Sequence, residues 1–101
     1  MSFDYYLSVE LLDLLHILQN KKNLSQRQLA NEVGFSLGKV NYCLKALLDI
    51  GFIKINHFNL SNQKLKYTYI ITPRGAQQKI IITKKFIAKK IQEYEKLKKY
   101  I

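Results

Sequence analysis

Apolar residues recur at helical spacing near the start of the chain. Within residues 9–20, leucine stands at positions 11, 14, 15 and 18, which is the stripe of an amphipathic helix. Val9, Leu12 and Ile17 widen that stripe beyond one face. We therefore expect an N-terminal helix within residues 1–20 that is either buried on two sides or meets another subunit with part of its surface.

Two shorter helices with recognisable ends are predicted within residues 25–50. Ser25 and Gln28 have the spacing of a capping box, and Gly34 suits the left-handed residue that ends a helix. Ser36 is a second N-cap candidate. The helix that it opens carries an apolar stripe of Val40, Leu44, Leu47 and Leu48. Two short helices joined by a tight turn have the layout of a helix-turn-helix, although other packed helix pairs share such a turn.

The next two segments predict a β-hairpin. Residues 52–58 and 65–71 are rich in β-branched and aromatic side chains that mostly alternate with polar ones, and the turn-prone stretch 59–64 separates them. A hairpin directly after the second helix of the pair occupies the position of the wing in a winged helix-turn-helix. The two features together are much more specific than either one alone.

The last part of the chain predicts one long helix over residues 73–101. Thr72 is its N-cap candidate, and Pro73 occupies the first helical position, where the missing N–H costs nothing. Its apolar positions, close to a seven-residue spacing, are Ile80, Ile87, Ile91, Tyr94, Leu97 and Ile101. One small domain cannot bury so long a stripe. We therefore expect a homodimer contact formed by Leu12, Ile80, Ile87, Ile91, Tyr94 and Leu97.

These elements predict a single domain over residues 1–101. The expected fold class is mainly α with a small β-hairpin, a winged helix-turn-helix with a long C-terminal dimerisation helix. The N-terminal helix lies within 1–20, the helix-turn-helix within 25–50, the wing within 52–71 and the C-terminal helix within 73–101.

Composition narrows the function. No apolar run in the 101 residues approaches the ~20 residues of a membrane span, and the N-terminus lacks the pattern of a signal peptide, so we expect a cytoplasmic protein. The chain shows no metal-ligand spacing, carboxylate pair or nucleophile with its base, so we expect no metal, no cofactor and no enzymatic activity. The lone Cys43 is interpreted as a small buried hydrophobe, with a redox sensor as the alternative.

The net charge of +10 favours an anionic partner: nucleic acid, an acidic membrane or an acidic protein. Many of the 17 basic residues lie on the last helix. That helix has a narrow isoleucine seam, which suits a partner helix better than a membrane surface. Double-stranded DNA is therefore the expected partner, and a membrane is not.

The polar face of the second short helix carries the candidate DNA-reading side chains. Asn41 can pair with adenine, and Lys39 can reach guanine O6 and N7 or a phosphate. The full set on this helix is Ser36, Gly38, Lys39, Asn41, Tyr42 and Lys45. Glycine at position 38 is explained either by a close approach to DNA or by tight helix packing. A merely solvated face is the alternative to DNA reading.

Two flanking segments add candidate phosphate contacts. The first helix of a helix-turn-helix crosses the DNA backbone, which makes Ser25, Gln26 and Arg27 candidates. The wing offers a second set of candidates, Asn62, Lys64 and Lys66. Hairpin tips are also often polar for solubility alone.

Several runs resemble MarR-type winged-helix regulators, and more narrowly the MarR-family regulators associated with exopolysaccharide production. They are residues 24–30 (LSQRQLA), 36–42 (SLGKVNY), 44–47 (LKAL), 64–69 (KLKYTY) and 72–75 (TPRG), with Thr83, Phe86 and 93–95 (EYE). The resemblance covers about residues 11–97. It implies a dimer held by the terminal helices, a reading helix over 36–50, a wing over 52–71 and control of exopolysaccharide or capsule genes. MarR proteins of usual size carry additional C-terminal helix that helps form an effector pocket, so a small-molecule effector is not favoured.

The sequence thus predicts a sequence-specific, DNA-binding transcriptional regulator that binds a pseudo-palindromic operator as a dimer. The alternative is a winged-helix interaction module that binds a protein or RNA partner.

Overall fold

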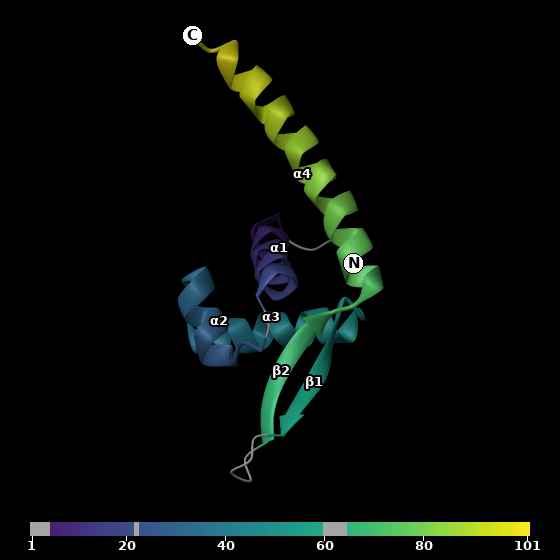
Figure 1. Ribbon diagram of the computed structural model, residues 1–101. Helices are drawn as coiled ribbons and strands as arrows, with labels where there is room; N and C mark the ends of the chain where they lie inside the picture. The colour runs from purple at the N-terminus through teal and green to yellow at the C-terminus, as the bar shows by residue number, and fades with distance from the viewer. Residues whose placement is uncertain (1–4, 22, 60–64) are drawn as a thin grey trace.

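The computed structural model describes residues 5–21, 23–59 and 65–101, and its elements follow the predicted order (Figure 1). They are α1 (Tyr5–Asn20), α2 (Gln26–Val33), α3 (Leu37–Asp49), β1 (Ile53–Asn59), β2 (Leu65–Ile71) and α4 (Pro73–Lys98). The predicted fold class, mainly α with a two-stranded hairpin and a long last helix, is confirmed.

The predicted caps are present at the helix ends. The Ser25 hydroxyl accepts a hydrogen bond from Gln28 N (3.2 Å), and the Gln28 side chain accepts one from Ser25 N (2.8 Å), which completes the capping box. Gly34 ends α2 with φ 75°, the left-handed conformation that favours glycine. Ser36 caps α3 by accepting a hydrogen bond from Lys39 N (3.2 Å), without the return bond of a capping box. The last helix differs from the prediction at its end, because α4 stops at Lys98 rather than at residue 101.

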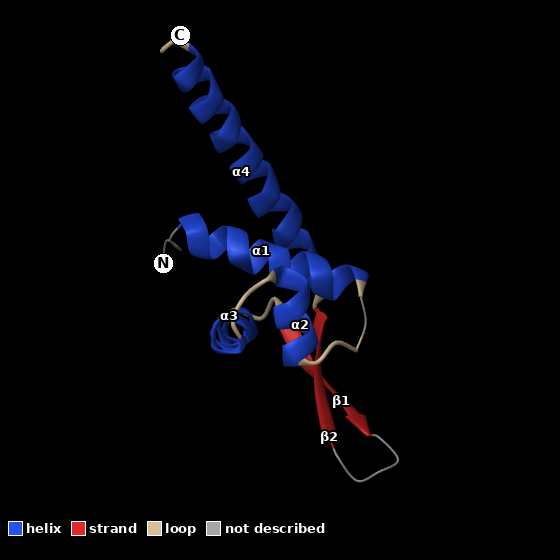
Figure 2. Ribbon diagram, turned by 90° about the vertical axis from the view of Figure 1, so that its left-hand side faces the viewer, coloured by secondary structure: helices blue, strands red, loops and turns tan. Residues whose placement is uncertain are grey.

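The strands form an antiparallel ladder that runs from Ile53 opposite Ile71 to Asn59 opposite Leu65. Two hydrogen bonds tie its base to the start of α4: Thr72 N donates to Phe52 O (2.9 Å) and Thr72 Oγ1 donates to Gly51 O (2.8 Å). The hairpin is therefore anchored at its base, and β1 and β2 extend away from the helical body (Figure 2).

Gly75 sets how closely α4 approaches Phe52, the residue before β1. A Cβ atom at this position would lie 2.0 Å from the carbonyl oxygen of Phe52, which is backbone and cannot rotate away. Only glycine allows α4 to begin so near the strand. Nothing in the local sequence pattern indicates this role for Gly75.

The core lies between α1, α2, α3 and the base of the hairpin. Its largest fully buried side chains are Leu14, Leu15, Leu29, Leu44, Leu47 and Val40. The first turns of α4 lean on this body through Ile82, whereas its later turns extend into solvent (Figure 1). The molecule is consequently elongated, with extents of 62 × 26 × 24 Å.

Within the described residues, none of the helices combines the length and the hydropathy that a transmembrane span requires.

Candidate nucleic-acid interface

Helix α3 has one face buried in the core and the opposite face exposed to solvent. Its apolar stripe, Val40, Cys43, Leu44 and Leu47, is at most 1% exposed. The six predicted DNA-reading residues of this helix, Ser36, Gly38, Lys39, Asn41, Tyr42 and Lys45, are all exposed. Tyr42 stands out furthest among the apolar residues of the helix, at 62% exposure. The described parts of the chain leave this ridge uncovered.

The exposed ridge has a centre and two edges. At about 100° per residue, Gly38, Tyr42, Lys45 and the final residue Asp49 point most directly away from the core, and Lys39 and Asn41 fall on opposite edges. A double helix that met the N-terminal part of the ridge would therefore face a tyrosine and a lysine, with a second lysine on one side and an amide on the other. Asp49 makes the C-terminal end of the ridge acidic.

Gly38 is the second residue of α3 and therefore lies in its first turn. A Cβ atom built there meets nothing within 4 Å among the described atoms. Tight packing within this chain therefore does not account for the glycine. That the glycine allows DNA to approach the helix closely stays a prediction.

Lys39 is held by the protein itself. Its ammonium pairs with the carboxylate of Glu10 on α1 and lies 4.9 Å from the centre of the Phe35 ring. The sequence pattern does not reveal Glu10 as this partner, since no local spacing connects two residues 29 positions apart.

The predicted phosphate contacts at the start of α2 are only partly free. Arg27 is exposed, whereas the Ser25 hydroxyl is occupied as a helix cap. The Gln26 amide donates a hydrogen bond to the hydroxyl of Tyr69 on β2 (2.9 Å). Gln26 thus already has a structural partner, which its position in the sequence did not reveal.

Of the three candidate residues on the wing, the structure describes only Lys66. Asn62 and Lys64 lie outside the described residues. Lys66 belongs to β2, where its backbone pairs with Phe58. Figure 1 shows the hairpin and the free end of α4 leaving the body in opposite directions. A surface built from α3 and the hairpin would lie away from the outer half of α4.

Comparison with known proteins agrees with this geometry. A family described as winged helix-turn-helix DNA-binding matches residues 11–54. The chain has the winged helix-turn-helix fold. Among proteins of curated function, none matches the sequence.

Three solved structures share the winged-helix fold at low identity. The protein smu.1704 from Streptococcus mutans has a TM-score of 0.71 at 16% identity, covering 90% of this chain and 88% of its own. RV1404 from Mycobacterium tuberculosis has a TM-score of 0.60 at 17% identity, covering 84% of this chain and 58% of its own. MarR from Staphylococcus aureus, in complex with salicylate and kanamycin, has a TM-score of 0.58 at 19% identity, covering 89% of this chain and 57% of its own. This chain thus spans less than two thirds of the last two proteins. The exopolysaccharide-associated subgroup stays a prediction.

Away from α3, the predicted dimer residues form an exposed apolar row along α4. Ile80, Ile87, Ile91, Tyr94 and Leu97 are between 54% and 62% exposed. Leu12 is different, because it packs partly against the core. Its remaining surface lines an open, mostly apolar groove between α1 and α4, together with Ile87 and Tyr94.

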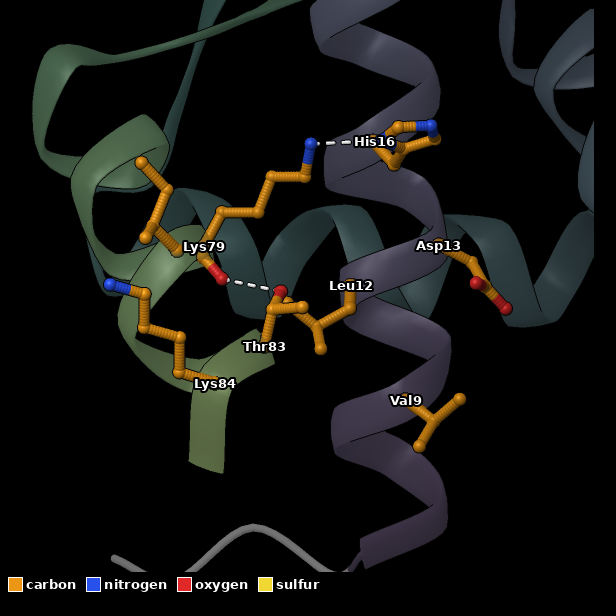
Figure 3. A pocket seen from close by; sticks show the side chains of 8 residues that line it. Val9, Leu12, Asp13, His16, Lys79, Thr83 and Lys84 are labelled. Carbon is orange, nitrogen blue, oxygen red and sulfur yellow. Dashed lines mark hydrogen bonds between the residues drawn. The ribbon is translucent and has the colours of Figure 1, made fainter. Parts of the chain in front are cut away.

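A neighbouring groove of about 550 Å³ between the same helices has a polar end (Figure 3). Lys79 of α4 reaches across it to His16 Nδ1 (2.8 Å) and Gln19 Oε1 (2.6 Å) on α1. These contacts fasten the start of α4 to α1, so the two helices border a common groove.

Cys43 is fully buried on the inner face of α3, as predicted. Burial, followed by the nearby Glu10 carboxylate, raises the pKa of its thiol, and Lys39 opposes that shift. The thiol form is favoured, which suits a packing residue better than a reactive one. Among the described residues, His, Cys, Asp and Glu side chains nowhere gather in threes that could hold a metal ion.

Proposed function

We propose that this protein is a transcriptional regulator that binds double-stranded DNA sequence-specifically, as a homodimer on a pseudo-palindromic operator. The observation that carries the proposal is the division of α3 into a buried stripe and an exposed ridge with polar and basic side chains. A net charge of +10 supports an anionic partner for that ridge.

In this mechanism α3 enters the major groove. Asn41, Tyr42 and Lys39 meet base edges and supply sequence preference, because amide and ammonium groups complement the donors and acceptors displayed there. Arg27, the backbone N–H groups at the start of α3 and the wing contact phosphates, and those contacts set affinity and register. Regulation follows from competition with, or recruitment of, RNA polymerase.

The dimer is proposed from the exposed apolar row on α4. Large apolar side chains at a near-heptad spacing, more than half exposed on a helix that leaves the body, are the pattern of a helix that packs against a second copy. Two copies would present their α3 helices in successive major grooves, about 34 Å apart.

The proposed target genes are those for exopolysaccharide or capsule production, because of the resemblance to MarR-family regulators associated with that process. The proposed location of the protein is the cytoplasm. The proposed action is binding alone, and the winged helix-turn-helix regulators that this chain is similar to are typically non-enzymatic. No cofactor or small-molecule effector is part of the proposal.

The test is selection of duplexes from a pool of random-sequence DNA at physiological salt, followed by titration of the selected duplex over a range of salt concentrations. We expect a two-fold symmetric consensus. Eight phosphate contacts per dimer would give a slope of roughly −7 in log K against log salt.

A slope near zero would overturn the proposal. Duplex binding without sequence preference, combined with tight binding of one specific RNA or protein, would favour an interaction module instead.

A further inference from the structure

The ammonium group of Lys39, on the exposed edge of α3, already has two partners in the free protein. Its Nζ atom pairs with a carboxylate oxygen of Glu10 and lies over the ring of Phe35 at 4.9 Å. The Lys39 side chain is 43% exposed and that of Glu10 is 22% exposed. The contact is therefore partly shielded from water, unlike an ion pair between two fully solvated side chains.

The two partners come from different parts of the fold. Phe35 belongs to the turn before α3, and Glu10 lies on α1, 29 positions earlier in the chain than Lys39. Because Lys39 occupies one edge of the ridge, its long side chain can turn either toward α1 or outward to a ligand. The structure has it turned toward α1. Asn41, on the opposite edge, and Tyr42, on the crest, are exposed.

We propose that Glu10 sets the affinity of the DNA interface by holding Lys39 on the protein surface, so that Lys39 must exchange this carboxylate for an acceptor on DNA. The inference rests on the proposed function and adds to it a residue of α1 that lies outside the helix-turn-helix. Glu10 acts through Lys39 and is a positioning residue.

The exchange lowers affinity for a physical reason. In the free protein the lysine charge is already matched by the carboxylate, and on binding that pair is broken and Glu10 returns to water beside a phosphate backbone of the same sign. A partly exposed ion pair of this kind changes an equilibrium by up to about fivefold for each lysine released. In a dimer the two factors multiply.

A purely structural pair would behave differently. If the Glu10–Lys39 contact only fastened α1 to α3, its loss would loosen the reading helix, and folding stability and DNA affinity would fall together. Release of a held lysine predicts opposite signs: a slightly less stable protein that binds DNA more tightly.

The test compares Glu10→Gln with a matched control, Glu32→Gln. Both variants remove one negative charge and one lysine ion pair, and Glu32 pairs with Lys21 (2.8 Å) rather than with a residue of α3. Each change is made in the wild-type chain and in a Lys39→Ala background, which completes a double-mutant cycle. The probe is the duplex selected by the wild-type protein, about 30 base pairs long, or roughly three helical turns. Affinity is measured by fluorescence anisotropy and stability by thermal unfolding.

We expect Glu10→Gln to bind about two- to fivefold more tightly per subunit than Glu32→Gln, with an unfolding temperature no higher than wild type. In the Lys39→Ala background the difference between the two variants should vanish. Glu10→Ala repeats the test with a shorter side chain if the glutamine variant folds poorly.

Failure of the inference differs from failure of the proposed function. If the wild-type protein binds DNA and Glu10→Gln binds no more tightly than Glu32→Gln, or if its advantage survives in the Lys39→Ala background, the inference is wrong. If the wild-type protein binds no duplex at all, the proposed function is wrong and the inference falls with it.

Discussion

The side-chain amide of Gln26, at the start of α2, donates a hydrogen bond of 2.9 Å to the phenolic oxygen of Tyr69 on β2. Tyr69 is only 7% exposed and belongs to the core. The bond joins the helix-turn-helix to the hairpin across 43 positions of sequence. It is one of the contacts that hold the hairpin against the helical body, together with the hydrogen bonds of Thr72 at the base of the hairpin.

Removing the Tyr69 hydroxyl should therefore weaken both stability and DNA binding. Tyr69→Phe leaves the Gln26 amide without its partner, and we expect a loss of about 1 kcal/mol in the free energy of unfolding, measured in urea. Weaker binding of the selected duplex should accompany it. Tyr42→Phe is the matched control, because it removes the same group from an exposed ridge, where folding stability should not change. Equal stability of the two variants would contradict this role for the bond.

The local pattern of polar and apolar residues predicted the helices and strands, but it could not predict contacts between residues far apart in the sequence. The caps at Ser25, Ser36 and Thr72 act within three residues of themselves, so spacing alone located them. The exposed ridge of α3 followed from helical periodicity for the same reason.

The pairings that tune the candidate site join distant segments. Gln26 meets Tyr69, and Lys39 meets Glu10, only because the helices pack at particular angles. No periodicity encodes such a contact. Gln26 and Lys39, both predicted to contact DNA, have partners within the protein that the local sequence pattern cannot reveal.

Gly75→Ala should be severely destabilising. The added Cβ would sit 2.0 Å from the Phe52 carbonyl oxygen, so either α4 or the base of β1 must move. We expect a loss of about 3 kcal/mol or more in the free energy of unfolding, at the upper end of the cost of overpacking. Chemical denaturation measures it, and a variant within about 0.5 kcal/mol of wild type would show that the two elements are not held this closely.

Gly38→Ala should have the opposite effect on stability. The methyl group meets nothing within 4 Å, and alanine favours the helix by up to about 1 kcal/mol. If the glycine serves a close approach of DNA, the stabilised variant should bind the selected duplex more weakly. Unchanged binding would leave the glycine without a role in DNA recognition.

The buried thiol predicts a pH dependence. Because the pKa of Cys43 is raised in the folded protein, the folded state holds the thiol proton more tightly than the unfolded chain does. This contribution to stability is present below the pKa of the unfolded thiol, about 8.5, and is lost progressively as the pH rises above it. Cys43→Ala should be less stable at neutral pH, because of the cavity, but should lose less stability between about pH 7 and pH 10. Parallel pH profiles for the two proteins would contradict the shift.

Base reading and phosphate contact should separate on mutation. Asn41→Ala should relax sequence preference at one position of each half-site, by about 1–3 kcal/mol of discrimination. Lys64→Ala, at a predicted wing contact outside the described residues, should weaken binding to all duplexes about equally and make the salt slope shallower by about one unit per contact removed. Competition binding with single-base variants of the selected duplex measures both effects. The reverse pattern would exclude this division of roles.

The exposed row on α4 predicts a dimer that a single charge should break. Ile91 lies near the middle of the row and is 56% exposed in one chain. A glutamate in its place would put two like charges beside each other across a two-fold contact, and each would lose part of its hydration. We expect Ile91→Glu to shift the protein from dimer to monomer in sedimentation experiments, with little change in its secondary structure.

Gln92→Glu is the matched control for this change, because it adds the same charge one position along the helix, about 100° away from the row. It should remain a dimer. The monomeric variant should also bind the symmetric duplex far more weakly, since each chain then pays its association entropy separately. A wild-type protein that sediments as a monomer, or an Ile91→Glu variant that stays dimeric, would exclude this row as the dimer contact.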